Sequence, residues 1–490
     1  MTEGVMQSMI RVAPALTLAL VVLGLAGCEV PQARMPVTTS SEKALERYMK
    51  GRADLEAFRP EQAHGHFAWA VREDPEFALA YLGLARAAAT EADFHDALQR
   101  AVALADRVTQ GERNMILAFQ AQMNGDQDEQ FRQVRRLAEG YPDDEQAQVL
   151  LGQAYFGKNN PSHAVRCFKR AVELDPTLVP AYEGLARVYL SLGRHKQAEE
   201  ALATLTKLAP DLEASHHLLG ELQMKLGQFD QSIASYEKAL ALDPGDVTAQ
   251  IAIGNNLLFM DRADEARERF RQLYDRAGDD DQRRTALVWI AAIHLHEEAP
   301  DEALEALREA TTVAERGDDA RALADVLEMM GDVLFESGSF DLAHAKFKES
   351  AAAIERTNFP GTVKMAARIN VVYHEARIAL AREDLMTAGE RITFYRRALG
   401  KQRIPEAKYR FTELGTRLGL AAGNYTAAEK SLQRADLDDP GVLLLSAEVF
   451  RAMGRPDEAR DFCDRAANFN EASLDLAFVR PKARRLLAEL

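Results

Sequence analysis

Residues 143–176 have the sequence DDEQAQVLLGQAYFGKNNPSHAVRCFKRAVELDP, and the next two stretches, 177–210 and 211–244, repeat the same order of side-chain types. A proline closes each unit at a constant step of 34 residues, at Pro142, Pro176, Pro210 and Pro244. Proline lacks a backbone N–H and restricts the residue before it, so each of these prolines should stop a helix. The period predicts an array of small helical units rather than one large core.

Three further kinds of residue keep the 34-residue step. Small residues are expected where two helices of a unit cross, large ones where the gap to the next unit is filled, and residues tolerant of left-handed backbone between the helices. These series are Gly152, Ala186, Gly220, Gly254 and Ala164, Ala198, Ser232, Ala266 (small), Phe168, Leu202, Tyr236, Phe270 (large), and Asn159, Gly193, Gly227, Asp261 (turns). The unit resembles the tetratricopeptide repeat (TPR), which implies an all-α superhelical solenoid of helix-turn-helix repeats.

The pattern extends in both directions and gives about twelve repeats between residues 41 and 470. Residues 41–280 form an N-terminal TPR array, and residues 281–470 a C-terminal array whose step approaches 40 residues in places, which predicts longer helices or loops. The loop 357–361 is the best candidate for a hinge. Residues 471–490 are expected to form a basic capping helix, because a solenoid needs a polar end.

The first 40 residues predict export and lipid attachment. Residues 12–24 (VAPALTLALVVLG) form an apolar run that is too short to span a bilayer but fits the central region of a signal peptide. Residues 25–28 (LAGC) resemble the lipobox of bacterial lipoproteins. The resemblance implies a signal peptide at 1–27, lipidation of Cys28 as the membrane anchor, and a linker over 28–40.

Two details concern where the chain starts and where it is sent. Glu29 resembles an outer-membrane sorting signal, since the residue after the lipidated cysteine is not Asp. A signal peptide begins with a positively charged end, and here the charge of Arg11 is cancelled by that of Glu3. A start at Met9 would remove Glu3 and leave the positive charge, so we expect Met9 to be the true start. The alternative to the lipobox is an ordinary cleaved signal with a cysteine beside it by chance.

Charge restricts the class of partner. The chain carries 60 Lys and Arg against 76 Asp and Glu, a net charge of -16. A chain of this sign is repelled by nucleic acid and by anionic lipid headgroups. We therefore expect other proteins as partners and a membrane attachment that is covalent, with no nucleic acid and no small-molecule substrate.

No motif in the sequence predicts catalysis, a cofactor or a metal site. The stretch 152–159 (GQAYFGKN) lacks the final Ser or Thr of a phosphate-binding loop, and no strand precedes it. The stretch 294–298 (HLHEE) lacks the order H-E-x-x-H and is interpreted as a solvated helix end. Cys167 and Cys463 are too far apart in a solenoid to pair and are interpreted as small buried hydrophobic residues.

The TPR resemblance places a partner-binding groove along the first helices of the repeats. The positions that face the groove in this family hold Gln153, Glu183, Arg187, His217, Glu221 and Asn255. Such a mixed polar surface suits an extended peptide or a helix of a partner protein. The alternative is that these side chains are simply solvated, and the same holds for a basic stretch at Arg391, Arg396, Arg397, Lys401, Arg403 and Lys408.

The sequence thus predicts a lipid-anchored TPR scaffold on the periplasmic side of the outer membrane. The resemblance extends to lipoproteins that help assemble pili, secretins or polysaccharide exporters. The alternative function is a cell-wall enzyme, or a regulatory subunit of one, tethered to the membrane. The partner, the leaflet and the oligomeric state stay open.

Overall fold

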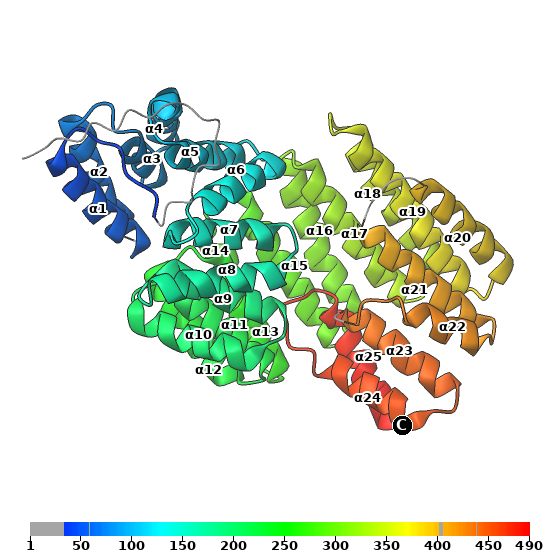
Figure 1. Ribbon diagram of the computed structural model, residues 1–490. Helices are drawn as coiled ribbons and strands as arrows, with labels where there is room; N and C mark the ends of the chain where they lie inside the picture. The colour runs from blue at the N-terminus through cyan, green and yellow to red at the C-terminus, as the bar shows by residue number, and fades with distance from the viewer. Residues whose placement is uncertain (1–33, 58, 401–404, 438) are drawn as a thin grey trace, which may run out of the picture. The chain divides into compact units, whose positions relative to one another are not determined.

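The computed structural model describes residues 34–57, 59–400, 405–437 and 439–490, and of residues 405–408 only the backbone. This part of the chain contains 25 α-helices and one short 3-10 helix, η1 (Ala105–Arg107), and no strand (Figure 1). The predicted all-α TPR solenoid is confirmed. None of the described helices combines the length and the apolar character needed to cross a membrane. Cys28 and the expected signal peptide lie outside the described residues.

Twenty-four helices form twelve consecutive pairs, which matches the predicted number of repeats. The first helices are α1 (Glu42–Glu56), α3 (Ala78–Arg86), α5 (Gln110–Met123), α7 (Glu145–Gly157), α9 (Val179–Ser191), α11 (Glu213–Lys225), α13 (Val247–Phe259), α15 (Asp280–His296), α17 (Ala320–Glu336), α19 (Gly361–Ala381), α21 (Pro405–Ala421) and α23 (Pro440–Ala452). The second helices are α2 (Pro60–Glu73), α4 (Glu91–Leu104), α6 (Gln127–Gly140), α8 (Pro161–Leu174), α10 (His195–Leu208), α12 (Phe229–Leu242), α14 (Ala263–Arg276), α16 (Pro300–Arg316), α18 (Phe340–Glu355), α20 (Leu385–Leu399), α22 (Tyr425–Leu432) and α24 (Pro456–Ala467). A last helix, α25 (Leu476–Glu489), follows the twelfth pair.

The turns inside the repeats have the backbone that the sequence predicts. Their φ angles are 53° at Asn159, 63° at Gly193, 72° at Gly227 and 58° at Asp261. This left-handed region is open to glycine and is tolerated by Asn and Asp, which explains the residue types at this step. The predicted turn positions are therefore confirmed.

The regular spacing of glycine and aromatic residues along the chain has a specific steric cause. A Cβ atom added at Gly254 would lie 2.4 Å from the ring of Phe270, and one added at Gly220 would lie 2.8 Å from the ring of Tyr236. Both rings are almost fully buried. In these two repeats the glycine of the first helix thus makes room for the aromatic ring of the second helix, whereas Gly184 on α9 faces the ring of Phe168 on α8 of the preceding repeat.

Packing divides the described chain into two bodies. The N-terminal body comprises the residues up to Arg52 together with Pro60–Lys158, and the C-terminal body comprises Asn159–Leu490, with Ala53–Arg59 grouped with it. In the C-terminal body the helices lengthen along the chain, from 13 or 14 residues in α8 to α14 to between 16 and 21 residues in α15 to α19.

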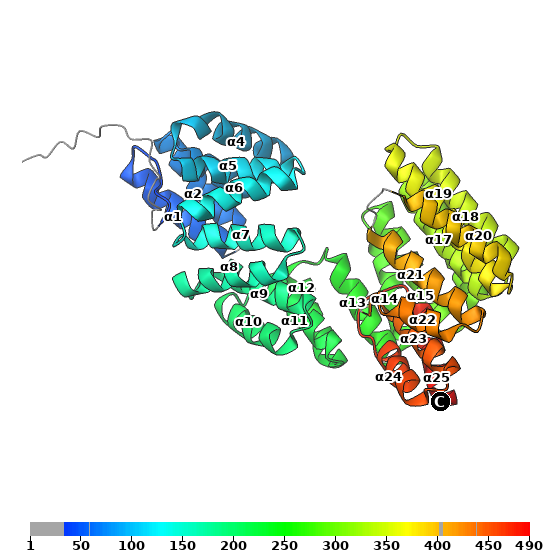
Figure 2. The same ribbon diagram turned by 45° about the vertical axis from the view of Figure 1, so that its right-hand side comes forward.

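Successive first helices contact one another, among them α9 with α11, α11 with α13, α13 with α15, and α19 with α21. In the C-terminal body we call the face that these first helices form the first-helix surface. Helix α25 contacts both α23 and α15, and the two views of the C-terminal body agree with this arrangement (Figures 1 and 2). The end of the chain therefore returns to the middle of the C-terminal body.

Candidate polypeptide-binding surface

In the N-terminal body, residues 34–40 contain no helix and are held by carboxylates at the starts of three successive repeats. Backbone N–H groups donate from Met35 to Asp144 at 3.1 Å, from Thr38 to Glu112 at 2.7 Å, and from Ser40 to Asp74 at 2.8 Å. The hydroxyl groups of Thr38 and Thr39 add bonds to Glu112 and Asp74. The repeats thus bind an extended piece of their own chain through its main chain.

These carboxylates are also fixed by the fold. Glu112 is fully buried and forms a reciprocal capping box with Thr109 at the start of α5. Burial opposes ionisation of Asp74, but hydrogen bonds from Thr39 and Ser40 outweigh it and lower its pKa. Residues 34–40 belong to the stretch predicted as a linker, and in the structure they are docked on the repeats because their N–H groups donate to these preorganised acceptors.

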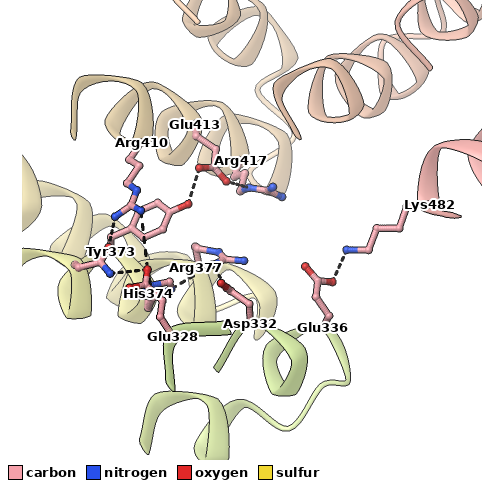
Figure 3. Close-up of polar contacts among 11 residues, drawn as sticks. Glu328, Asp332, Glu336, Tyr373, His374, Arg377, Arg410, Glu413, Arg417 and Lys482 are labelled. Atoms are coloured by element: carbon pink, nitrogen blue, oxygen red, sulfur yellow. Dashed lines mark hydrogen bonds and ion pairs between the residues drawn. The ribbon is translucent and has the colours of Figure 1, made fainter. Parts of the chain in front are cut away.

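In the C-terminal body, residues 469–490, here called the C-terminal segment, lie across the ends of four successive first helices. Ion pairs connect Glu471 with Lys225 at the end of α11, Arg484 with Asp261 after α13 (2.9 Å), Arg485 with Glu298 after α15 (2.7 Å), and Lys482 with Glu336 at the end of α17 (Figure 3). Three basic residues of the expected capping helix, Lys482, Arg484 and Arg485, are thus paired with acidic residues of the chain.

Apolar contacts also hold the C-terminal segment on two sides. Leu476 and Ala477 are buried in a cluster with side chains of α13, α15 and α17. Val479, Ala483 and Leu486 pack on α23 and α24. Helix α25 therefore covers the last repeat, as a cap does, and also binds the first-helix surface.

Arg480 is the most deeply buried cation of the C-terminal segment, with a side chain over the ring of Phe259 at 3.9 Å from its centroid. Its guanidinium donates to the carbonyl of Phe469 at 2.8 Å and to Asn470 Oδ1 at 3.0 Å. Burial and the nearby charge of Arg484 lower its pKa to about 10. The Arg480 side chain therefore contacts the Phe259 ring of α13 and holds the loop before α25 through hydrogen bonds.

The predicted groove residues occupy several environments. Gln153 is exposed on α7 in the N-terminal body. In the C-terminal body Arg187 is exposed and pairs with Glu183 at 2.9 Å, and Glu221 lies 3.9 Å from Lys225. His217 points its Nδ1 atom at Asp246, 3.0 Å away. Asn255 is 2% exposed and donates to the carbonyl of Ile251, so it does not present its amide to solvent.

A ladder of polar side chains on α17, α19 and α21 was not predicted from the sequence (Figure 3). Its members are Glu328, Asp332, Asn370, Tyr373, His374, Arg377, Arg410, Glu413 and Arg417. Its contacts join neighbouring first helices: Arg377 to Asp332 at 2.7 Å, Tyr373 to Glu413 at 2.6 Å, Asn370 to Glu328 at 2.7 Å, and Arg410 to Asn370.

Burial and pairing shift the pKa values of two members of the ladder, Glu328 and His374. Burial opposes ionisation of Glu328, yet hydrogen bonds from His374 and Asn370 and the charge of Arg410 lower its pKa to about 2. Burial lowers the pKa of His374, whose ring stacks on Phe347 with centroids 3.5 Å apart. A single unpaired charge here would be costly, so the members stabilise one another.

The motifs rejected in the sequence have structural roles. The stretch 152–159 lies in α7 and the turn after it. His294 lies 3.7 Å from Glu297, and Glu298 pairs with Arg485 rather than with a histidine. The two cysteines are buried and unpaired. In the basic stretch, Arg391 pairs with Glu375, and the side chains of Lys401, Arg403 and Lys408 lie outside the described part.

Relatives among curated proteins match short parts of the chain. They include the CTR9 homolog of Arabidopsis thaliana, 31% identical over 107 residues (22% of this chain, 10% of the relative), and tetratricopeptide repeat protein 17 of Danio rerio, 35% identical over 94 residues (18% and 8%). The chain thus spans between 8% and 17% of the length of the first curated relatives it matches.

Solved structures with similar folds include the MamA protein, at 25% identity and a TM-score of 0.30, covering 33% of this chain and 88% of that one. Another is a tetratricopeptide repeat protein from Parabacteroides merdae, at 15% identity and a TM-score of 0.41, covering 53% and 97%.

Family models described as tetratricopeptide repeat match residues 48–112, 159–222, 214–246, 282–356 and 417–473. These matches together span more than half of the chain, and they fall on helix pairs of the solenoid. The chain therefore belongs to the tetratricopeptide-repeat family.

Proposed function

We propose that this protein is an interaction scaffold that binds segments of partner proteins along its repeats and catalyses no reaction itself. One observation carries the proposal: each of the two bodies already binds a piece of its own chain. Residues 34–40 are bound in extended form across three repeats, and the C-terminal segment is bound as a loop and helix across four. A surface that orders extended and helical polypeptide of its own chain has the groups needed to bind a partner's.

Two stretches of the first-helix surface remain for a partner in the C-terminal body. The first contains the exposed Arg187 on α9 and the half-buried Glu221 on α11. The second is the ladder, where the side chains of Arg410 and Arg417 are 40% and 39% exposed. Their guanidinium groups have donors enough for a carboxylate of a partner in addition to the contacts they make now.

The cellular setting is part of the same proposal and rests on the sequence. The chain is anchored by lipid at Cys28 on the periplasmic side of the outer membrane, where it serves assembly or regulation of a cell-envelope machine of the pilus, secretin or polysaccharide-export type. The docking of residues 34–40 supports this proposal, because the chain that follows Cys28 is hydrogen-bonded directly to the first repeats.

Crosslinking in living cells tests the partner site. A photoreactive amino acid at Arg187 or Arg417 should capture the same partner protein, whereas one at Lys196, exposed on the second helix α10, should not. Arg187→Glu should reduce recovery of that partner with wild-type protein levels, and Lys196→Glu should leave it unchanged. Equal capture at Lys196, or full recovery with Arg187→Glu, would remove the first-helix surface from the proposal.

The anchor is tested separately by membrane fractionation. Cys28→Ala should move the protein from the outer-membrane fraction to the soluble periplasmic fraction, because the acyl chains are lost. Continued sedimentation of this variant with the membrane would contradict attachment through Cys28.

A further inference from the structure

A cluster of three potential metal ligands lies between two neighbouring first helices. Glu213 and His217 stand one turn apart on α11, and Asp246 precedes α13. His217 Nδ1 lies 3.6 Å from Glu213 Oε1 and 3.0 Å from Asp246 Oδ2. One ligand atom from each residue lies within 4.8 Å of the other two.

Contacts outside the cluster fix two of the three groups. Asp246 is the N-cap of α13, and its Oδ1 atom accepts from the N–H of Ala249 at 3.0 Å, so its Oδ2 atom is turned toward His217. The imidazole of His217 stands edge-on to the ring of Tyr236, with centroids 5.2 Å apart and planes at 88°. Oriented ligands of this kind are what a metal site requires of its supporting contacts.

The charges at the cluster are left uncompensated by other side chains. In the chain that the structure describes, no Lys or Arg forms an ion pair with Glu213 or Asp246; their ion-pair partner is His217. Two carboxylates that converge on one point in this way favour a divalent cation between them.

We propose that Glu213, His217 and Asp246 bind a divalent transition-metal ion, Zn²⁺ in the first place, that links the repeats of α11 and α13. Zinc bonds to imidazole nitrogen and carboxylate oxygen at about 2.0–2.2 Å, which in tetrahedral geometry separates the donor atoms by roughly 3.3–3.6 Å. The distances of 3.0 and 3.6 Å from His217 Nδ1 are close to that range.

The donor set also indicates which ions are less suited. Imidazole suits zinc and its neighbours in the first transition row, while Ca²⁺ and Mg²⁺ prefer oxygen ligands throughout. Three protein ligands leave a fourth position of a tetrahedral ion free for water. Sequence patterns did not predict the site because Asp246 is 29 residues away from His217 and belongs to the next repeat.

Calorimetric titration of Zn²⁺ into the full-length protein, first freed of metal with a chelator, tests the proposal. We expect one tight site per chain, a rise in the unfolding temperature on adding Zn²⁺, and little effect of Mg²⁺. His217→Ala should weaken zinc binding at least about tenfold. His195→Ala, which removes a histidine of α10 outside the cluster, should bind zinc as the wild type does.

Two conservative variants distinguish the loss of a metal ligand from a folding defect. Asp246→Asn keeps a good N-cap side chain but loses the charge, and Glu213→Gln keeps the shape of the side chain. Both should fold with unchanged circular dichroism and lose the zinc-induced rise in unfolding temperature. Absence of zinc binding in the wild type, or unchanged binding in all three cluster variants, would overturn the proposal. No partner protein enters the measurement, so its outcome is independent of the proposed scaffold function.

Discussion

The docking of the C-terminal segment should depend on apolar contact far more than on its ion pairs. Leu476 is 3% exposed and belongs to the cluster formed by α13, α15 and α17. Replacing a buried leucine by alanine costs about 2–5 kcal/mol. The pairs made by Lys482, Arg484 and Arg485 are exposed to solvent, and such pairs contribute about 0.2–1 kcal/mol each and weaken with salt.

Hydrogen exchange followed by mass spectrometry separates these contributions. Leu476→Ala should speed exchange of the α25 amides by roughly thirtyfold or more, equally at low and high salt. The triple variant Lys482→Ala, Arg484→Ala and Arg485→Ala should speed it by a smaller factor at low salt and hardly at all at high salt. Release of α25 by the triple variant at high salt, with Leu476→Ala protected as in the wild type, would refute the reasoning.

Three further predictions concern packing, acid and thiols. Gly184→Ala should destabilise the protein by about 1–3 kcal/mol in denaturant unfolding, because the new Cβ would lie 2.4 Å from an aromatic ring, whereas Gly389→Ala, with nothing within 4 Å, should stabilise it by about 0.5–1 kcal/mol; the reverse order would contradict the packing. The pKa of Glu328 is lowered from 4.5 to about 2, so its contribution to the free energy of unfolding is fully present above pH 4.5 and is lost as the pH falls toward 2. Glu328→Gln should flatten the dependence of the free energy of unfolding on pH between these values, and an unchanged slope would refute the pairing. Cys167 and Cys463 are buried and burial raises the pKa of both thiols, so neither should react with a thiol reagent until the protein unfolds; fast labelling of the native protein would contradict their burial.

The fold could be predicted from the sequence because each repeat carries its structure locally. A turn residue at Asp261 or Gly227 and a proline after the second helix act within one repeat, and a glycine opposite an aromatic ring acts within one repeat or between two neighbouring repeats. The period multiplies the signal. The same argument gave the number of repeats. The 34-residue period also placed Arg187 and Glu221 on first helices, because their positions within the repeat are known once its start is fixed.

The docking of the two chain segments and the ladder could not be predicted from the sequence, because they depend on contacts between distant residues. The pairing of Lys482 with Glu336 joins residues 146 apart, and residues 34–40 meet Glu112 across 74. Neither separation is a multiple of the repeat. The ladder was missed because its rungs, such as Asp332 with Arg377, lie 45 residues apart in repeats whose lengths vary. The polar residues at given positions of the repeat could be identified in the sequence, but the residues that they contact could not.

The claim that the repeats bind polypeptide is tested most directly by supplying the C-terminal segment in trans. A labelled peptide with the sequence of residues 469–490 is titrated with the full-length Leu476→Ala variant, whose own segment is loosened, and binding is followed by fluorescence anisotropy. We predict saturable binding to the variant, weaker binding to the wild type, whose surface is occupied, and loss of binding when Leu476 in the peptide is also replaced by alanine. A peptide that binds neither protein, or binds both equally whatever its residue 476, would contradict the account.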